Sequence, residues 1–172
     1  PASRPRPARV PPASRPPDVR DGRRAGPCRV VAVDTFLAIA SRRDERKTLP
    51  EQLPEDVAGR ILDAGRLTGS SRNGQPWTFA VPTTRARIEA LAATVHVPGN
   101  LLEAGLVVAI LVDGRGPIAF DAGRAAQSML LAAWNEGIAS CPNGVSDQDE
   151  ARRATDARES ETVTIVLSFA ME

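Results

Sequence analysis

The stretch Ser70-Ser71-Arg72-Asn73-Gly74-Gln75-Pro76-Trp77 joins a polar loop to the start of an apolar strand, residues 77–81. The loop holds two hydroxyls, two side-chain amides and a glycine, and such groups can approach a flat polar ligand closely. The same residue types are also the usual ones of an ordinary surface turn. The stretch therefore predicts a loop that enters a strand, and its residues alone leave open whether the loop binds a ligand.

Before the loop, the chain predicts a helix over residues 54–67. Pro54 is followed by two acidic residues, which is typical of a helix start because negative charge favours the first turn. The apolar residues that recur at helical spacing, and that we expect on the buried face, are Val57, Ile61, Ala64 and Leu67. This helix would deliver the polar loop.

After the strand, Thr84 predicts the cap of a second helix, in which Ile88, Leu91 and Val95 are spaced for burial. Residues 106–112 then form a continuous apolar run rich in valine. A run of this length without alternation is typical of a strand buried on both faces.

Residues 119–136 predict a long helix that is apolar nearly all the way round between Ala125 and Trp134. Such a helix lies either at the centre of a fold or between subunits, and both interpretations stay open. Beyond it we expect a short strand over residues 138–141 and a polar helix over residues 146–158.

Residues 162–170 predict the last strand. The residues expected on one side of it are Val163, Ile165, Leu167 and Phe169. Strands that alternate with helices in this way indicate an α+β or α/β sandwich.

Three segments form a specific combination in their order and separation. The first, Ser41-Arg42-Arg43-Asp44-Glu45-Arg46, follows a short apolar helical stretch, and the second is the loop quoted above. The third runs from Asp121-Ala122-Gly123-Arg124-Ala125-Ala126-Gln127 to Gly137-Ile138-Ala139-Ser140-Cys141-Pro142-Asn143-Gly144. In this combination, which extends over residues 33–170, the chain resembles the FMN-dependent nitroreductase family.

The resemblance implies an α+β fold of nitroreductase type for residues 31–172. This fold is a three-layer sandwich, with a mixed β-sheet flanked by helices, and two subunits form an intertwined homodimer with FMN at the interface. The implied activity is that of a flavoprotein oxidoreductase, which transfers hydride from NAD(P)H through FMN to a nitroaromatic, a quinone or a similar small acceptor. The choice of NADH or NADPH stays open, as do the dehalogenation, ring oxidation and flavin breakdown that some relatives perform.

The resemblance also assigns residues to the FMN site, in three groups. Arg42, Arg43 and Arg46, with Asp44 among them, would hold the phosphate and ribityl end, because guanidinium groups pair well with phosphate oxygens. The partner subunit would contribute a second group to the flavin ring: Gly69, Ser70, Ser71 and Asn73, with Gln75 supporting the loop.

The third group is Pro142, Asn143 and Gly144, which would lie over the isoalloxazine with a backbone N–H near its N5. A donor there would stabilise the negative charge of the reduced flavin. The resemblance implies no side chain acting as general acid or base and no metal.

Three departures from the family pattern stand out. Asp44 occupies a position where the family usually has a small hydroxyl residue, and Gly69 a position where it commonly has proline. The chain also ends at Glu172, directly after the last strand, whereas the family commonly has a tail that brings another basic residue to the phosphate. Loss of that contact is expected to weaken FMN binding roughly 10-fold to 150-fold. These departures favour an alternative, a flavin-binding or degenerate family member without redox turnover.

Charge and proline are distributed unevenly along the 172 residues. Residues 1–30 hold 8 of the 22 basic residues, 2 of the 21 acidic ones and 8 of the 15 prolines, without helical or strand periodicity. We therefore expect a disordered extension there. The remaining 14 basic and 19 acidic residues make an acidic body, which argues against a nucleic-acid-binding domain.

The remaining expectations concern location and isolated reactive residues. No apolar run approaches 18 residues and no secretory segment is evident, so we expect a cytoplasmic protein without a membrane partner. Cys28 and Cys141 have no metal-ligand spacing and predict no disulfide. His96 is the single histidine, and we expect it to be a loop or edge residue without a chemical role.

Overall fold

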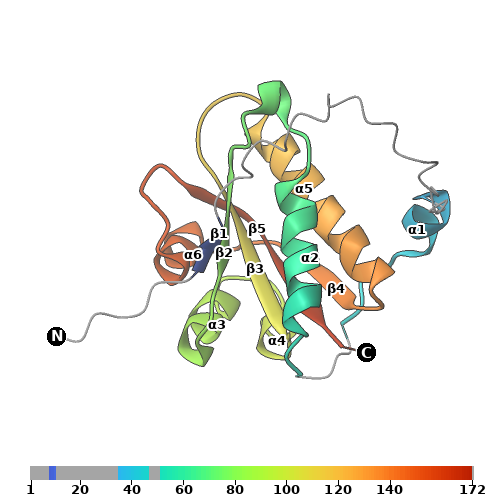
Figure 1. The fold of residues 1–172 in the computed structure, drawn as a ribbon. Helices are drawn as coiled ribbons and strands as arrows, with labels where there is room; N and C mark the ends of the chain where they lie inside the picture. The colour runs from blue at the N-terminus through green and yellow to red at the C-terminus, as the bar shows by residue number, and fades with distance from the viewer. Residues whose placement is uncertain (1–7, 11–34, 47–50, 172) are drawn as a thin grey trace.

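The structure is a computed structural model that describes residues 8–10, 35–46 and 51–171 (Figure 1). Its strands are β1 (Ala8–Val10), β2 (Trp77–Val81), β3 (Leu106–Val112), β4 (Ala139–Asn143) and β5 (Thr162–Ala170). Its α-helices are α1 (Thr35–Ser41), α2 (Glu55–Arg66), α3 (Arg85–Ala92), α4 (Gly99–Leu102), α5 (Ile118–Asn135) and α6 (Gln148–Thr155), and a short 3-10 helix covers Ser71–Asn73. Among the described helices, none has the length and apolarity needed to cross a membrane.

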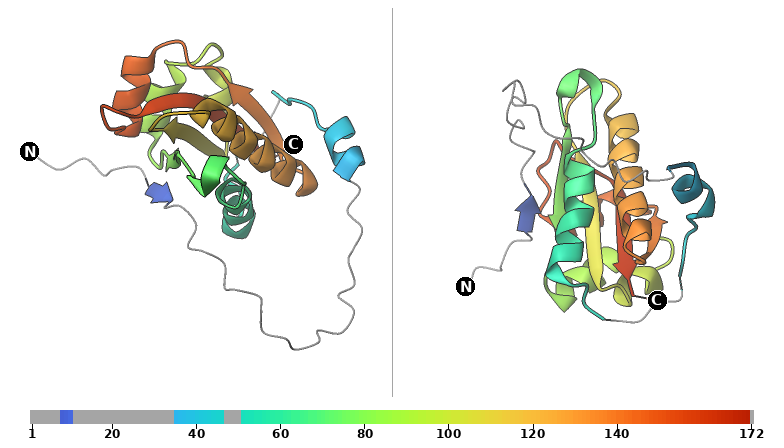
Figure 2. Two further views of the ribbon diagram at one scale, coloured as in Figure 1. Left: turned by 90° about the horizontal axis from the view of Figure 1, so that it is seen from above. Right: turned by 45° about the vertical axis from the view of Figure 1, so that its right-hand side comes forward.

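The strands form one sheet in the order β1-β2-β3-β5-β4, with helices on both faces (Figure 2). Helices α2 and α5 pack on one face, and α3, α4 and α6 pack on the other. The predicted three-layer α+β sandwich is confirmed. The expectation of a mixed sheet needs correction, because every pairing among the described strands is antiparallel: β5 lies between β3 and β4 and runs opposite to both.

Strand β3 is the centre of the fold and divides the core into two parts. Val108, Ile110 and Val112 face α2 and α5, while Val107, Ala109 and Leu111 face the opposite helices. All six residues are buried. The predicted strand with two buried faces is therefore confirmed, and its alternating side chains hold the three layers together.

Strand β5 contains a bulge that changes which residues share a face. Ile110 pairs with Ile165 but Leu111 pairs with Val163, so Thr164 is an extra residue on β5. A bulge shifts the alternation by one position. Val163 consequently packs on the α3, α4 and α6 side, not with Leu167 and Phe169 as its spacing in the sequence predicted.

Helices α2 and α5 pack closely against each other on their face of the sheet. A Cβ added to Gly65 of α2 would overlap the side chain of Met129 of α5, so the contact depends on the absence of a side chain there. Leu67, predicted to be buried, is 65% exposed. The reason is helical phase: steps of three residues drift around a helix of 3.6 residues per turn, and Gly65 takes the inward position instead.

Other elements differ from expectation in their bounds. The polar helix starts later and ends earlier than predicted, because Asp147 caps α6 by accepting the Glu150 N–H at 3.0 Å, and Asp156 ends it in a left-handed conformation. Helix α4 and strand β1 were not predicted. Of the segment 1–30, only β1 is described; the expected disorder of its other residues, including Cys28, lies outside the described residues.

Candidate functional site

The arginine segment, residues 42–46, follows α1 and runs beside β4. The Glu45 N–H donates to the Ser140 carbonyl oxygen at 3.2 Å, which ties the segment to the strand. Just before it, Ser41 accepts a hydrogen bond of 2.9 Å from the Trp134 indole near the C-terminal end of α5. These contacts hold the segment at the junction of α5 and β4.

Two of the three arginines in this segment pair with acids inside it. Arg42 donates to Asp44 at 2.9 Å, and Arg43 lies 3.4 Å from Glu45. The Arg42 side chain is only 17% exposed, whereas that of Arg43 is 74% exposed. Asp44 is therefore compensated by Arg42, and an arriving phosphate would have to share this guanidinium with the carboxylate.

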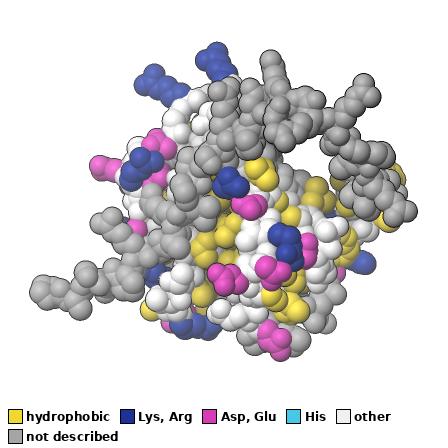
Figure 3. All heavy atoms as spheres, in the orientation of Figure 1, with side chains coloured by type: hydrophobic (Ala, Val, Ile, Leu, Met, Phe, Trp, Pro, Cys, Tyr) yellow, Lys and Arg dark blue, Asp and Glu magenta, His cyan; other side chains and the backbone are white. Residues whose placement is uncertain are grey.

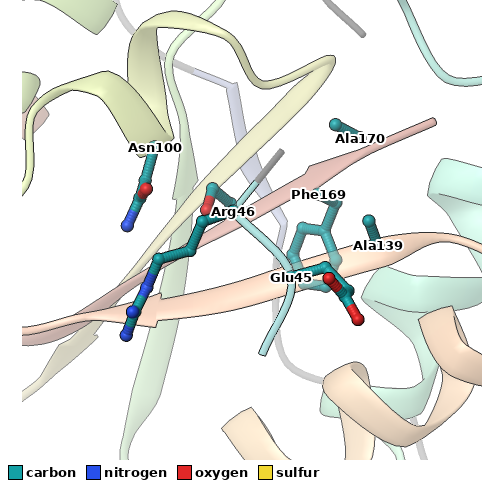
Figure 4. Close-up of a pocket in the computed structure, with 7 residues that line it drawn as sticks. Glu45, Arg46, Asn100, Ala139, Phe169 and Ala170 are labelled. Atoms are coloured by element: carbon teal, nitrogen blue, oxygen red, sulfur yellow. The ribbon is translucent and has the colours of Figure 1, made fainter. Parts of the chain in front are cut away.

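Arg46 lies beside Asn100 of α4 in a small surface hollow. Figure 4 shows the Arg46 and Asn100 side chains extending in a similar direction, while the Glu45 side chain turns away from them. The hollow has a volume of about 200 Å³ that includes open solvent. Its lining is Glu45, Arg46, Asn100, Ala139, Ser168, Phe169 and Ala170. The volume that it encloses is only about 10 Å³, far below the roughly 300–1,000 Å³ typical of ligand pockets, so it can take at most a small part of a cofactor.

A buried polar network lies beneath this hollow, centred on Asn143 at the end of β4. The Asn143 Nδ2 lies 3.0 Å from the Cys141 carbonyl oxygen, 3.2 Å from that of Val166 and 3.1 Å from the Ser168 hydroxyl. The Asn143 Oδ1 accepts from Asn100 at 2.8 Å. This side chain is thus fully engaged inside the protein, and only the backbone of this segment can serve a ligand.

Cys141 belongs to the same network and is 2% exposed. Burial raises the pKa of its thiol; a hydrogen bond from Arg46 opposes this rise, and the negative charge of Asp44 adds to it. The thiol therefore stays protonated at neutral pH, which argues against a nucleophilic role.

The turn after β4 is held against the segment that follows α3. Val95 and Val145 form a β-bridge, and the His96 N–H donates to the Gly144 carbonyl oxygen at 3.4 Å. The Ser146 N–H donates to the Thr94 carbonyl oxygen at 2.7 Å. Pro142, Asn143 and Gly144 are thus fixed from both sides. Pro142 and Asn143 lie on the same strand as Cys141, the neighbour of Arg46, and Gly144 directly follows that strand.

The polar loop, residues 69–75, sits at the other end of α5. The Ser71 N–H donates to the Asp121 carboxylate at 2.9 Å, and the Gln75 N–H donates to the Ser70 hydroxyl at 2.8 Å. Arg72, Asn73 and Gln75 all have positive φ angles, between 44° and 54°. Such backbone is costly for residues other than glycine, so the fold around the loop must hold it in place.

Gly69 packs against Arg124 of α5. A Cβ added to Gly69 would lie 3.1 Å from the Arg124 guanidinium. Arg124 also lies 3.8 Å from Asp121, the residue that binds the loop. Glycine at position 69, where the family commonly has proline, thus leaves room for the close contact between the loop and Arg124.

Within one chain, the structure brings together two of the three predicted groups. The arginine segment and residues 142–144 both adjoin β4, but the polar loop is bonded to Asp121, near the N-terminal end of α5. Asp121 and Trp134 are about 20 Å apart along the helix, at 1.5 Å per residue. The loop and the arginine segment of one chain are therefore on opposite ends of α5.

Sequence reasoning missed several residues of this region. Asn100 and Ser168 join the hollow and the polar network, and His96 adjoins Gly144, although all three are remote from these partners in sequence. No local pattern marks them, because their roles arise from tertiary contacts. Asp121 could have been noticed in the sequence, since it is an acid in the first turn of a buried helix. Its hydrogen bond with the Ser71 N–H could not be predicted from the sequence.

Known proteins are similar to this chain in sequence and in fold. The model of the nitroreductase family matches residues 111–170. A protein of Methanothermobacter thermautotrophicus, provisionally named NADH dehydrogenase/NAD(P)H nitroreductase, is 30% identical over 123 residues, or 68% of this chain. The chain spans 64% of that relative's length.

Two solved structures resemble the chain over most of its length. An FMN-dependent nitroreductase from Clostridium difficile has a TM-score of 0.73 at 21% identity, with 80% of this chain and 87% of that one covered. A nitroreductase with bound FMN from Bacteroides fragilis has a TM-score of 0.69 at 20% identity, with 81% and 89% covered. At these identities the likeness establishes the fold.

Proposed function

This chain is a nitroreductase-family protein in its fold and in the sequence of residues 111–170, and on that premise we propose that it is an FMN-dependent oxidoreductase. It takes reducing equivalents from NAD(P)H and passes them to a small acceptor such as a quinone or a nitroaromatic. The observation that carries the proposal is the position of the arginine segment beside the fixed turn at residues 142–144, at the junction of α5 and β4.

The residues present at this junction fit the phosphate end of FMN. Arg46 offers a guanidinium group in the hollow, and Arg42 and Arg43 lie within the same short segment. Ser140, whose carbonyl holds the segment, has a buried hydroxyl without a hydrogen-bond partner among the described residues. Guanidinium, amide and hydroxyl donors are the groups that proteins use to bind phosphate.

A second copy of the chain completes the proposed site. The polar loop of one chain is too far from its own arginine segment, so the loop beside a given FMN would come from the partner, and the protein would be a homodimer. Helix α1 supports this arrangement, because it exposes Phe36 (80%) and Ile39 (57%) beside α5. A second subunit would remove such apolar side chains from water.

When bound, FMN would supply the hydride chemistry, and the residues of this chain would bind and orient the participants. The arginine segment would neutralise the phosphate, and the fixed turn would direct a backbone N–H toward the flavin ring. Cys141, buried and protonated, would take no part. No side chain would need to act as a general acid or base.

The test is to incubate the purified chain with FMN, separate free flavin by gel filtration, and record the visible spectrum and elution volume together. We expect flavin to be retained at the size of a dimer, and NADH or NADPH to be oxidised when menadione or a nitroaromatic is added. A chain that retains no flavin would overturn the proposal. Retained flavin without turnover would overturn the reductase activity alone.

The ion pair between Arg42 and Asp44 favours a second candidate, a flavin-binding protein without redox turnover. Because the carboxylate competes with the phosphate for this guanidinium, the flavin would be held more weakly or in another position. The same experiment distinguishes the two candidates, since this one predicts retained flavin and no oxidation of NADH or NADPH with any acceptor.

A further inference from the structure

The only histidine of the chain lies beside the turn at Gly144. A Cβ added to Gly144 would be 3.4 Å from the His96 Cδ2 and 3.8 Å from its Nε2, so the imidazole edge faces the open side of this glycine. The backbone fixes this arrangement through the bond from the His96 N–H to the Gly144 carbonyl and through the bridge between Val95 and Val145. The ring is therefore held at the turn by main-chain contacts.

The imidazole itself is available for a ligand. His96 is exposed, and no hydrogen bond or ion pair of its ring occurs with any residue in the described part of the chain. An imidazole offers both a hydrogen-bond donor and a flat ring. The exposed His96 imidazole beside Gly144 can therefore contact a small molecule bound at the turn.

We propose that His96 contacts the electron acceptor and helps to determine which acceptors are used. This inference rests on the proposed function, in which the turn at Gly144 borders the flavin ring. A quinone or nitroaromatic resting on the flavin would present oxygen atoms at its edge, and the His96 ring N–H would donate to one of them. His96 is thus a specificity-determining residue, while the fold depends only on its backbone.

The first experiment uses the single imidazole as its own reporter. In the untagged chain of 172 residues the histidine ring protons give one set of NMR signals, because this sequence has one histidine. We expect these signals to shift when FMN is added to the flavin-free protein, and again when menadione is added without NAD(P)H. If the visible spectrum shows bound FMN and neither addition moves the histidine signals, the inference is overturned.

The second experiment compares His96→Phe, which keeps a flat ring without a donor, with His96→Gln, which keeps an N–H donor. For one lost neutral hydrogen bond, His96→Phe should raise the KM for menadione about 3-fold to 10-fold. His96→Gln should recover part of this loss, and the Kd for FMN should stay unchanged in both. An unchanged KM in His96→Phe would contradict the assignment.

One control variant and the FMN-retention experiment separate this inference from other effects. Glu103→Gln alters an exposed residue further along the same connection and should change neither the KM nor the Kd for FMN. Failure of the unaltered chain to retain FMN would overturn the proposed function, and the inference with it. Retained FMN with an unresponsive histidine would overturn the inference alone.

Discussion

At the scale of single residues, Asn143 shows how a buried polar side chain fixes the candidate site. Its amide connects the end of β4 to β5 through Val166 and Ser168, and to α4 through Asn100. Buried networks of this kind are stable only when every member is satisfied. The position of the turn at Gly144 therefore depends on a residue that is buried and whose side chain is bonded within the protein.

Replacement of Asn143 by leucine should lower the free energy of unfolding by about 2 to 4 kcal/mol, because the half-buried Asn100 amide, the buried Ser168 hydroxyl and the Cys141 and Val166 carbonyl oxygens each lose a hydrogen bond. Urea denaturation followed by circular dichroism measures this change. Asn135→Leu, at an exposed position near the end of α5, is the matched control and should alter stability by less than about 0.5 kcal/mol. Equal effects of the two substitutions would contradict the role of the network.

Asp44 is the residue whose charge opposes the proposed phosphate site most directly. Asp44→Ser would free Arg42 and remove a negative charge, so FMN binding should tighten on the order of 10-fold, as measured by quenching of flavin fluorescence. Asp56→Ser removes an acid that is likewise bonded to an arginine, but on the exposed side of α2, and should leave the Kd for FMN unchanged. The gain should shrink as salt is raised. Weaker binding in Asp44→Ser would show that the carboxylate supports the site.

At the scale of elements, the hydrophobic pattern predicted β2, β3 and β5 with their observed bounds, and α5 to within one residue at each end. These elements are long and their burial is regular, so local sequence determines them. The bulge at Thr164 could not be predicted from the sequence, because it results from the pairing of β5 with β3 and has no local sequence pattern. The same holds for the strand order, which depends on contacts distant in sequence.

The link between α5 and the polar loop can be tested at the charged hydrogen bond between the Ser71 N–H and the Asp121 carboxylate. Asp121→Ala would leave the Ser71 N–H without its partner, and should lower the free energy of unfolding by about 1.5 to 3 kcal/mol. Hydrogen exchange at Ser71 should become faster in the same variant. Asp149→Ala removes an acid from the first turn of α6, where it is exposed, and serves as the control. Unchanged exchange at Ser71 would show that the loop is held by other contacts.

At the scale of the whole molecule, two features bear on whether a second subunit completes the site: the exposed apolar residues of α1 and the distance between the polar loop and the arginine segment. Figure 3 shows basic and acidic side chains mixed among hydrophobic ones on the face that carries α2. Arg60 of this helix forms ion pairs with Asp56 and Glu136. The hydrophobic residues of α1, by contrast, are exposed at one end of the molecule. The sequence resemblance assigned three segments to an FMN site, but the distance between the loop and the arginine segment became evident only in three dimensions.

A mixing experiment tests whether each FMN site combines the arginine segment of one copy with the polar loop of the other. Arg46→Gln should weaken FMN binding roughly 10-fold to 150-fold by removing a charged phosphate contact, and Ser70→Ala with Ser71→Ala should damage the loop. If each site combines groups from both copies, a dimer of one Arg46→Gln copy and one loop-variant copy has two unlike sites. One site combines the intact arginine segment with the intact loop, and the other combines the two altered groups. Refolding the two variants together should therefore restore activity that neither has alone.

The size of the restored activity follows from the statistics of mixing. A two-fold symmetric dimer holds two equivalent sites. Random pairing of equal amounts of the two variants makes about half of the dimers mixed, and each mixed dimer has one working site of two. About a quarter of the activity of the unaltered protein should therefore return. The control is a mixture of an Arg60→Gln copy with the loop-variant copy, because Arg60 lies on the exposed side of α2 in ion pairs with Asp56 and Glu136. The Arg60→Gln variant should be fully active before it is mixed. If the Arg46→Gln and loop variants stay inactive together while each still forms dimers, both groups must act within one chain, and the loop would have to move about 20 Å along α5 to reach its own arginine segment.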